Sequence, residues 1–311
     1  MSLPNDRYPK IAQVLSREDI MDLYRDLSTP MPPDLDSIPE ENMVVLKVSD
    51  GESTCGMAAG FIPPGSDFCR IQTLFLEGGY RNAQNTAALI KCIYEKSGKH
   101  PGVKKTVWRY QAPPADTPDA HMKICAMAGD IPFTSKIVDH VFIMDLHEVM
   151  NIRPKIRTCD EAFLVSKGFK AVRCIDCIKE RKEEIGALLK DADSELLQLS
   201  PIDEKERDED NSFFVISRED DSICGWMICR KMEEGCVEIA RLYVFQGHRK
   251  TMTGLYFGAF MLKRLGERYD RAQMKVFPGN MQVINLLRKD LGKCTRESFE
   301  KLITMEYQKK P

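Results

Sequence analysis

The chain has 311 residues, of which 43% are hydrophobic and 30% are charged, and its formal net charge is −2 at pH 7. This length suits two domains that each bury a core, and the composition is that of an ordinary soluble globular protein. The near-neutral charge argues against nucleic-acid binding as the main function. Apolar runs have strand length and the first residues lack the apolar core of a signal peptide, so we expect neither a membrane span nor secretion.

Eleven cysteines are present, which is an odd number for a disulfide framework. Without a secretory signal, free thiols in a reducing compartment are expected, so we predict a cytoplasmic protein. Cys174 and Cys177 form a CxxC pair, but two thiolates supply only half of the ligands that a structural zinc requires. We therefore predict that the cysteines are buried or have no functional role, and that the protein binds no metal.

In chain order, the first half predicts a short helix, a β-hairpin, a third strand that enters a helix through a polar turn, and then a strand, a helix and a strand. The stretch Ser16-Arg-Glu-Asp is typical of a helix start, and Asp50-Gly51 is typical of a hairpin turn. The expected helices cover residues 20–27, 82–96 and 117–129, and the expected strands cover residues 43–48, 55–62, 68–76, 105–110 and 135–146.

The second half repeats the same kinds of element after a predicted connector with a short helix at residues 151–168. The acidic stretch at residues 201–211 is predicted to be a surface loop, with a substrate-facing lid as the functional alternative. The expected strands cover residues 169–175, 213–217, 224–229, 237–244, 273–277 and 298–307, and the expected helices cover residues 178–189, 255–265 and 280–292.

Both halves contain a turn between a strand and a helix that aligns without gaps. Placing Arg81 on Arg249 gives an offset of 249 − 81 = 168 residues, and Leu76 then meets Val244. A repeat of this length indicates two copies of one fold. Such a turn leaves the first backbone N–H groups of the helix directed at one point, with the positive end of the helix dipole behind them. This arrangement binds anions.

The second turn resembles the acetyl-CoA-binding segment of the GNAT N-acetyltransferase superfamily. In that segment an Arg or Gln is followed after two residues by Gly, and after one more by Gly or Ala. Arg249 and Gly254 match this pattern, and Met252 stands where the first Gly is usual. The first copy has Gln84 and Thr86 in place of both glycines.

The resemblance implies an α+β fold with αβα layers and a mixed sheet that splays near its middle, present twice in tandem. It implies a degenerate copy at residues 1–150 and a candidate catalytic copy at residues 169–311. It also implies acetyl-CoA as co-substrate, with its diphosphate at the helix start and a backbone N–H at the end of the strand for the oxyanion. The residues expected to bind acetyl-CoA are Val244, Arg249, Lys250, Met252, Thr253, Gly254, Leu255 and Asn280.

Glu238 stands where many members of the superfamily carry the general base for the attacking amine. In a regular strand Glu238 would share its side with Ala240, Leu242 and Val244, and apolar neighbours raise the pKa of a carboxylate. The alternatives are a solvated edge Glu or a structural partner for Arg241. The sequence therefore predicts Glu238 as the catalytic residue.

In many members a Tyr on the helix opened by Asn280 protonates the departing thiolate, but that position holds Leu287 here. Tyr243 and Tyr256 are the alternative proton donors, and the sequence favours neither over the other. His248 stands where Tyr is common, and we expect it to have a packing or solvated role.

The resemblance thus implies an N-acetyltransferase whose C-terminal copy moves an acetyl group to a primary amine on a small molecule or peptide. The first copy, with Arg70 at the position of Glu238, would serve packing or substrate framing. The alternatives are a non-catalytic module that binds acyl-CoA and a structural protein that acts by assembly. Neither nucleic acid nor membrane is an expected partner, and the sequence predicts no oligomeric state.

Overall fold

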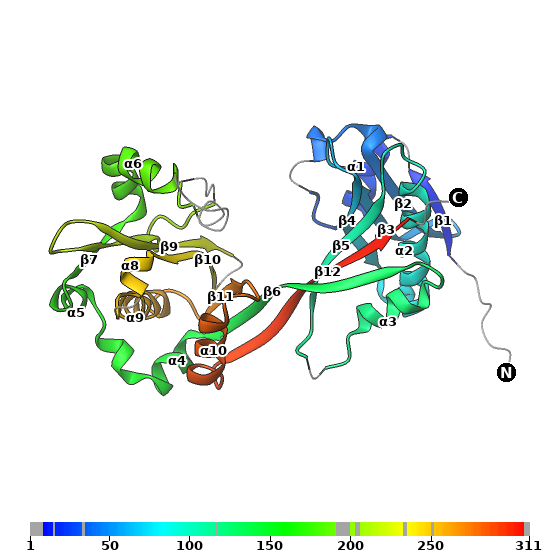
Figure 1. The fold of residues 1–311 in the computed structure, drawn as a ribbon. Coiled ribbons are helices and arrows are strands. Elements are labelled where there is room, and N and C mark those ends of the chain that lie inside the picture. Colours follow the sequence, from blue (N-terminus) through cyan, green and yellow to red (C-terminus); the bar gives the residue numbers. More distant parts are fainter. Residues whose placement is uncertain are drawn as a thin grey trace. The chain divides into compact units, whose positions relative to one another are not determined.

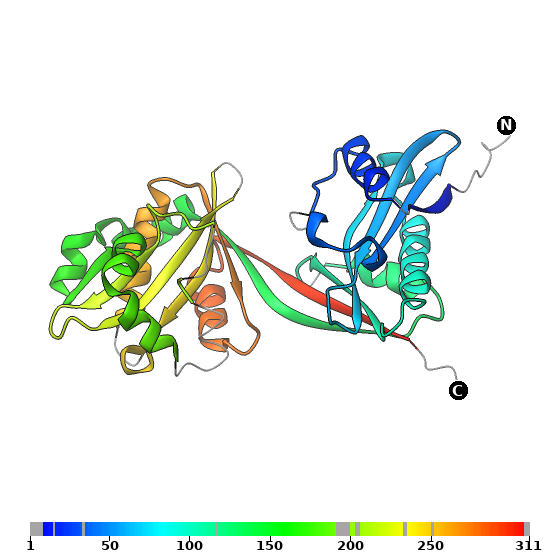
Figure 2. The ribbon, with the colours of Figure 1, turned by 90° about the horizontal axis from the view of Figure 1, so that it is seen from above.

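The computed structural model describes residues 9–14, 16–32, 35–115, 117–190, 200–202, 206–232, 235–249 and 252–307. The chain forms two compact units, shown as ribbons in Figures 1 and 2. Unit 1 comprises Met1–Val138 and Phe299–Pro311, and unit 2 comprises Asp139–Ser298. Unit 1 thus includes the end of the chain, which the sequence assigned to the second domain, and unit 2 includes the predicted connector.

Unit 1 is built on a mixed sheet with the strand order β1-β2-β3-β4-β5-β12. Neighbouring strands are antiparallel, except that β4 and β5 are parallel. The strands are β1 (Lys10–Val14), β2 (Met43–Asp50), β3 (Ser53–Phe61), β4 (Phe68–Leu76), β5 (Lys105–Ala112) and β12 (Thr295–Glu306). The helices are α1 (Arg17–Asp26), α2 (Ala83–Ser97) and α3 (Ala120–Met127), with 3₁₀ turns η1 (Leu35–Ser37), η2 (Glu40–Asn42) and η3 (Gly78–Tyr80).

Unit 2 repeats this arrangement with the strand order β7-β8-β9-β10-β11-β6. Here β10 and β11 form the parallel pair. The strands are β6 (Phe133–Asp145), β7 (Phe169–Arg173), β8 (Phe213–Ser217), β9 (Ile223–Lys231), β10 (Cys236–Val244) and β11 (Arg271–Val276). The helices are α4 (Leu146–Ile152), α5 (Glu161–Ser166), α6 (Cys174–Lys190), α8 (Gln246–Arg249), α9 (Thr253–Gly266) and α10 (Met281–Asp290), with the 3₁₀ helix η4 (Pro154–Thr158).

Local signals place most of these elements where the sequence predicted them. The Ser16 side chain caps α1 by accepting from the Asp19 amide, and Gly51 has the positive φ of 64° that the β2–β3 turn requires. Strand β1 was not predicted, because five half-exposed residues carry little periodic signal. The α+β fold with a mixed sheet and helical layers is confirmed.

Each sheet packs helices on both faces. In unit 2, one core joins the sheet to α9 and α10 through buried residues such as Phe257, Phe260 and Leu287. The other core lies between the sheet and α6, and includes Cys177, Ile185 and the fully buried Trp226. Among the described residues, no helix is long and apolar enough to cross a bilayer.

The repeat extends to an irregularity in the parallel strands. Strands β4 and β10 have the same length at an offset of 168 residues (236 − 68 = 168). In β4, Gln72 is an extra residue between Ile71 and Thr73, which pair with the adjacent Gly60 and Ala59. In β10, Ala240 is the extra residue in the same way, and 240 − 72 is again 168. The two copies therefore share a β-bulge at one position, which a chance similarity of two turns does not explain.

The two units exchange their closing strands. Residues Phe299–Glu306 of β12 pair with β5 in unit 1, although β12 begins in unit 2. Conversely, residues 140–145 of β6 pair with β11 in unit 2, although β6 begins in unit 1 (Figure 1). Each sheet is therefore completed by a strand that starts in the other unit.

Tyr307 fixes the end of β12 in unit 1. Its ring stacks on Tyr94 at 4.4 Å between centroids, and its hydroxyl lies 2.6 Å from the hydroxyls of both Ser97 and Thr106. A Cβ on Gly98 would lie 2.5 Å from the Tyr307 ring. Gly98 has a right-handed φ of −66°, so this close ring, and not a left-handed turn, requires glycine after α2.

Aromatic rings fill the core of unit 1 between β5 and α3. His121 lies 5.1 Å from the Trp108 ring and 4.4 Å from the Tyr110 ring, measured between centroids. Tyr110 donates to Asp119, which is also paired with Lys301 at 2.8 Å. Burial lowers the pKa of His121, although Asp119 opposes this shift.

We predict that Ile303→Ala destabilises unit 1 and not unit 2. Ile303 is fully buried in the core of unit 1, so its truncation should cost about 2–5 kcal/mol. Hydrogen exchange should then accelerate in β5 and not in β10. Ile284→Ala is the matched control, because Ile284 is equally buried in unit 2 and should give the opposite result. Faster exchange confined to β10 in Ile303→Ala would contradict the strand exchange.

We also predict that unit 1 loses stability as the pH falls. Because the folded-state pKa of His121 is lowered, the unfolded chain binds this proton first as the pH drops below about 6.5. The contribution of neutral His121 is complete above that pH and is lost as the pH falls through the folded pKa. His121→Phe should flatten the dependence between pH 7 and 5 in denaturant titrations. An unchanged slope would show that other groups cause it.

Candidate functional site

The parallel strands of unit 2 separate halfway along their length. β10 pairs with β11 from Cys236 to Ile239, and the parallel register ends there. β10 continues to Val244 while pairing with β9 on its other side. The bulge at Ala240 falls at the point where pairing with β11 ends, because the extra residue turns the strand and disrupts the ladder. The predicted splay of the sheet is therefore present in this unit.

The bulge changes the side of the sheet that each residue faces. Val237, Ile239 and Leu242 all contact the core under α9, whereas Tyr243 contacts the core under α6. The alternation of side chains between the two faces of the sheet thus reverses between Ile239 and Leu242. Glu238 consequently faces α6, and the prediction that it shares a side with Leu242 and Val244 is wrong. A one-residue insertion in a strand exchanges its two faces beyond the insertion.

Glu238 is buried, with 8% of its surface exposed, and forms an ion pair with Arg230. The Nη2 atom of Arg230 lies 2.6 Å from the Oε2 atom of Glu238. The two residues face each other directly in the β9–β10 register. Arg241, the partner considered from sequence, donates to the carbonyl of Ala240 at 2.9 Å.

Sequence reasoning missed Arg230. It is the penultimate residue of the strand Ile223–Lys231, whose first seven residues carry no charge, and the two cations at the end of that strand were the available signal. The antiparallel register that sets Arg230 opposite Glu238 depends on the turn after Lys231 and on the bulge. Neither feature is visible in the strand composition alone.

Helix α9 begins beside the end of β10. A Cβ on Gly254 would lie 3.7 Å from a methyl group of Val244, so the first turn of the helix adjoins the end of the strand. Met252 occupies the N-cap position, and no side-chain hydrogen bond caps this helix in the described part of the chain. Met252 and Leu255 are half-exposed, and Thr253 is buried.

The remaining predicted cofactor residues lie on the same turn or on the next helix. The backbone of Arg249 closes the short helix α8, while Lys250 and the Arg249 side chain lie outside what the structure describes. Asn280 caps α10, and its side chain accepts from the Val283 amide at 3.4 Å. The sequence prediction that Asn280 opens this helix is confirmed.

The equivalent helix in unit 1 begins differently. The Asn82 side chain caps α2 by accepting from the Asn85 amide at 2.8 Å. The Asn85 side chain in turn donates to the Tyr80 carbonyl at 3.0 Å. In unit 1, a side chain thus accepts a hydrogen bond from one of the free amides at the start of α2. In unit 2, the N-cap residue of α9 is Met252, whose thioether cannot cap a helix.

The candidate proton donors are distributed over both faces of the unit 2 sheet. Leu287 is buried in the core under α10 and carries no donor. Tyr243 stacks on Trp226 on the α6 face, at 5.1 Å between centroids. Tyr256 packs edge-on against Phe163 at 5.7 Å, on the side of α9 that faces α5. Tyr243 therefore shares its face with Glu238, and Tyr256 does not.

The cysteines are free thiols, and burial raises the pKa of most of them. All eleven cysteines are free, and ten of them are buried. Burial raises the pKa of the Cys174 thiol to about 12 and that of Cys177 to about 11. Within the described ranges, no group of three or more His, Cys, Asp or Glu residues is placed to hold a metal.

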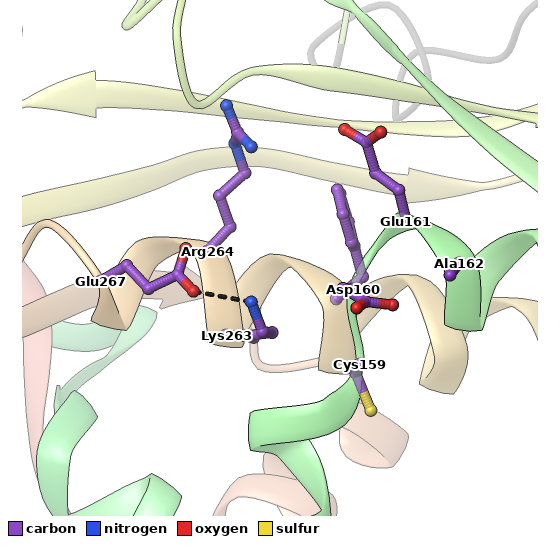
Figure 3. A pocket seen from close by; sticks show the side chains of 8 residues that line it. Cys159, Asp160, Glu161, Ala162, Lys263, Arg264 and Glu267 are labelled. Carbon is purple, nitrogen blue, oxygen red and sulfur yellow. Dashed lines mark hydrogen bonds and ion pairs between the residues drawn. The ribbon is translucent and has the colours of Figure 1, made fainter.

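A hollow of about 310 Å³ lies away from this site, between α5 and α9 (Figure 3). Lys263 and Glu267 form an ion pair on its wall at 2.6 Å, and Arg264 and Asp160 also line it. It opens on the outer side of α9 and contains none of the predicted residues. We therefore base the site on the splayed strands and not on this hollow.

The acidic loop predicted at residues 201–211 is tied down in the part that the structure describes. Asp208 is 2% exposed and accepts from the Tyr269 hydroxyl at 2.6 Å and from the Asn211 side chain at 2.7 Å. The first bond ties the loop to the segment between α9 and β11, and the second closes the loop on itself, which argues against a lid. Residues 203–205 lie outside the described ranges.

No family model and no curated protein matches the chain. Among solved structures, the chain is similar to a tandem GNAT protein from the clavulanic acid biosynthesis pathway, with 12% identity and a TM-score of 0.59 over 97% of this chain and 100% of that one. It is similar to a GCN5-related glucosamine N-acetyltransferase region of a fungal multi-domain β-N-acetylglucosaminidase, with 11% identity and a TM-score of 0.54 over 98% of this chain and 40% of that one. A GNAT-family acetyltransferase from Colwellia psychrerythraea gives 11% identity and a TM-score of 0.51 over 96% of this chain and 100% of that one.

These identities establish the fold and nothing finer. Both units of this chain have the same order of strands, a parallel pair that separates after four residues, and a bulge beside that pair. The chain therefore consists of two GNAT N-acetyltransferase folds in tandem.

Proposed function

We propose that the chain is an acyl-CoA-dependent N-acyltransferase that transfers an acetyl group from acetyl-CoA to a primary amine in unit 2. The observation that supports this most is the difference between the two helix starts. Side chains of unit 1 cap α2, whereas α9 has only Met252 at its N-cap position. A helix start without a side-chain cap binds a phosphate through its amides and its dipole.

Acetyl-CoA would lie with its diphosphate at residues 252–255 and its pantetheine arm between the separated ends of β10 and β11. Arg249, Lys250 and Asn280 are the further residues assigned to its binding. The thioester would then lie near the bulge, where backbone N–H groups of β10 between Ala240 and Val244 would stabilise the oxyanion. The end of the parallel pairing at Ile239 supports this path.

Glu238 would act as the general base, directly or through a water. The acceptor ammonium gives one proton to Glu238, and the resulting amine attacks the thioester carbon. The C–S bond of the tetrahedral intermediate then breaks, and the thiolate takes the second nitrogen proton. Tyr243 lies on the same face as Glu238 and is the better-placed tyrosine for this last transfer. The products are an amide, CoA thiol and one proton released from Glu238.

A second candidate function is a module that binds acyl-CoA without turnover. The ion pair between Glu238 and Arg230 favours it, because a carboxylate held by a guanidinium has a structural role without any catalysis. Release of CoA thiol in the presence of an amine separates the two functions. A binding module would bind the donor and release none.

We predict that Glu238→Gln lowers kcat by about 10²–10⁴-fold, because an amide cannot accept the proton from the acceptor. The affinity for acetyl-CoA should stay within twofold. Thiol release and equilibrium titration measure the two quantities. The matched control is Glu300→Gln, because Glu300 is also a largely buried strand glutamate paired with an arginine, Arg109, but lies in unit 1. Unchanged turnover in Glu238→Gln would remove Glu238 from the mechanism.

We predict that Met252→Gly tightens CoA binding by about threefold to tenfold. The exposed Met252 side chain stands at the N-cap, where glycine is the better residue and leaves room for phosphate. Isothermal titration of the full chain measures the change, with one site expected per chain. The control is Gln84→Gly at the equivalent position of unit 1, which should alter nothing. If both substitutions change the affinity for CoA equally, CoA binds to both units or to neither helix start, which would contradict binding in unit 2 alone.

A further inference from the structure

The α6 face of β9 and β10 carries a group of charged side chains around Glu238, which we call the ionic cluster. Its members within the described chain are Arg207, Glu209, Arg230, Glu238 and Arg241. Arg207 donates to Glu209 at 2.6 and 3.0 Å, and its backbone bridges to Arg230. Charges on a sheet face that also packs apolar side chains are costly unless they are paired or used.

The central pair of the cluster presents two opposite charges side by side. Arg230 and Glu238 are direct neighbours across the strands, and their charged atoms are 2.6 Å apart. The Arg230 side chain is 29% exposed and the Glu238 side chain is only 10% exposed, so Arg230 is the more accessible member of the pair. A ligand can therefore meet the guanidinium first and the carboxylate behind it.

Arg241 adds a second guanidinium on the same face. Because Ile239 and Leu242 both contact the core under α9, the two residues between them face α6. Arg207, Arg230 and Arg241 thus bring three guanidinium groups to this face, and guanidinium groups pair with carboxylates in a planar, bidentate geometry. The cluster therefore suits a ligand with a carboxylate in addition to its ammonium group.

We propose that the acceptor of the transferred acyl group is an α-amino acid. Its ammonium and carboxylate groups are separated by one carbon, so they match a carboxylate and a guanidinium that lie side by side. The ammonium binds Glu238, and the carboxylate takes the guanidinium of Arg230, with Arg241 beside it. This inference rests on the proposed function, since it assigns the substrate of that same site.

Binding of the substrate carboxylate to Arg230 also explains how the paired Glu238 becomes a base. When the substrate carboxylate binds Arg230, it replaces Glu238 as the partner of that guanidinium. Glu238 is then free to accept the ammonium proton, so binding of the correct acceptor activates the base. An amine without a carboxylate leaves the Arg230–Glu238 pair intact. The position of unit 1 that corresponds to this pair holds no carboxylate, because Phe61 faces Arg70 there.

The first test compares matched acceptors on the unmodified chain with acetyl-CoA as donor. The pairs are phenylalanine with phenethylamine, lysine with cadaverine, and glycine with glycinamide. We expect kcat/KM for CoA-thiol release to be at least about tenfold higher for each amino acid, the effect of one charge-assisted hydrogen bond. Equal or higher values for the amines would overturn the inference while leaving the acyltransferase function standing.

The second test uses Arg230→Gln and Arg230→Lys, each checked for folding by circular dichroism and thermal melting. Arg230→Gln should raise KM for amino acids more than tenfold. It should not lower kcat/KM for the matched amines, because the substitution releases Glu238 from its ion pair. Arg230→Lys keeps the charge but loses the planar fork, so it should restore part of the loss. The control is Arg153→Gln, whose exposed partner Asp290 lies away from the site. Equal losses for amines and amino acids would assign Arg230 a structural role.

A third measurement separates failure of this inference from failure of the proposed function. Titration calorimetry with phenylalanine and phenethylamine, in the presence of CoA, needs no turnover. Binding of phenylalanine alone, abolished in Arg230→Gln, supports the acceptor class even if no thiol is released and the enzyme assignment fails. Absence of phenylalanine binding to the unmodified chain overturns the inference directly.

Discussion

The separation of β10 from β11 after four paired residues is the constraint on which the rest of the structure depends. Ala240 is an extra residue at that point, so the strand turns and its two faces exchange. The bulge directs Glu238 and Arg241 toward α6 and leaves Val244 beside the first turn of α9. One inserted residue thus sets both the separation of the two strands and the charges beside it.

The two units share this frame but differ in what surrounds it. Unit 1 has its own bulge at Gln72, yet Asn82 caps its helix and aromatic rings occupy the core between β5 and α3. Unit 2 has Met252 at the helix start and an ion pair at the bulge. The closing strands β6 and β12 each belong to both units, so neither unit completes its sheet without the other part of the chain. The strand exchange therefore gives unit 1 a structural role of its own.

Much of this could be predicted from sequence, because local patterns and one internal repeat carry it. The offset of 168 residues, the hairpins and the Asn280 cap follow from turn chemistry and spacing. The strand exchange could not be predicted, because residues 298–307 read as a strand of either unit and only pairing decides. The bulge at Ala240 has no composition signal, and for that reason the predicted neighbours of Glu238 were wrong. The role of Arg230 follows only from the strand register, which sets this residue opposite Glu238.

The central claim is that anion binding belongs to the start of α9 and not to the start of α2. Hydrogen exchange of the full chain with and without saturating CoA tests it most directly, because the amides that grip a diphosphate become protected. The account predicts added protection at residues 252–255 and none at residues 83–86. Protection at residues 83–86 alone, or at neither helix start, would contradict it.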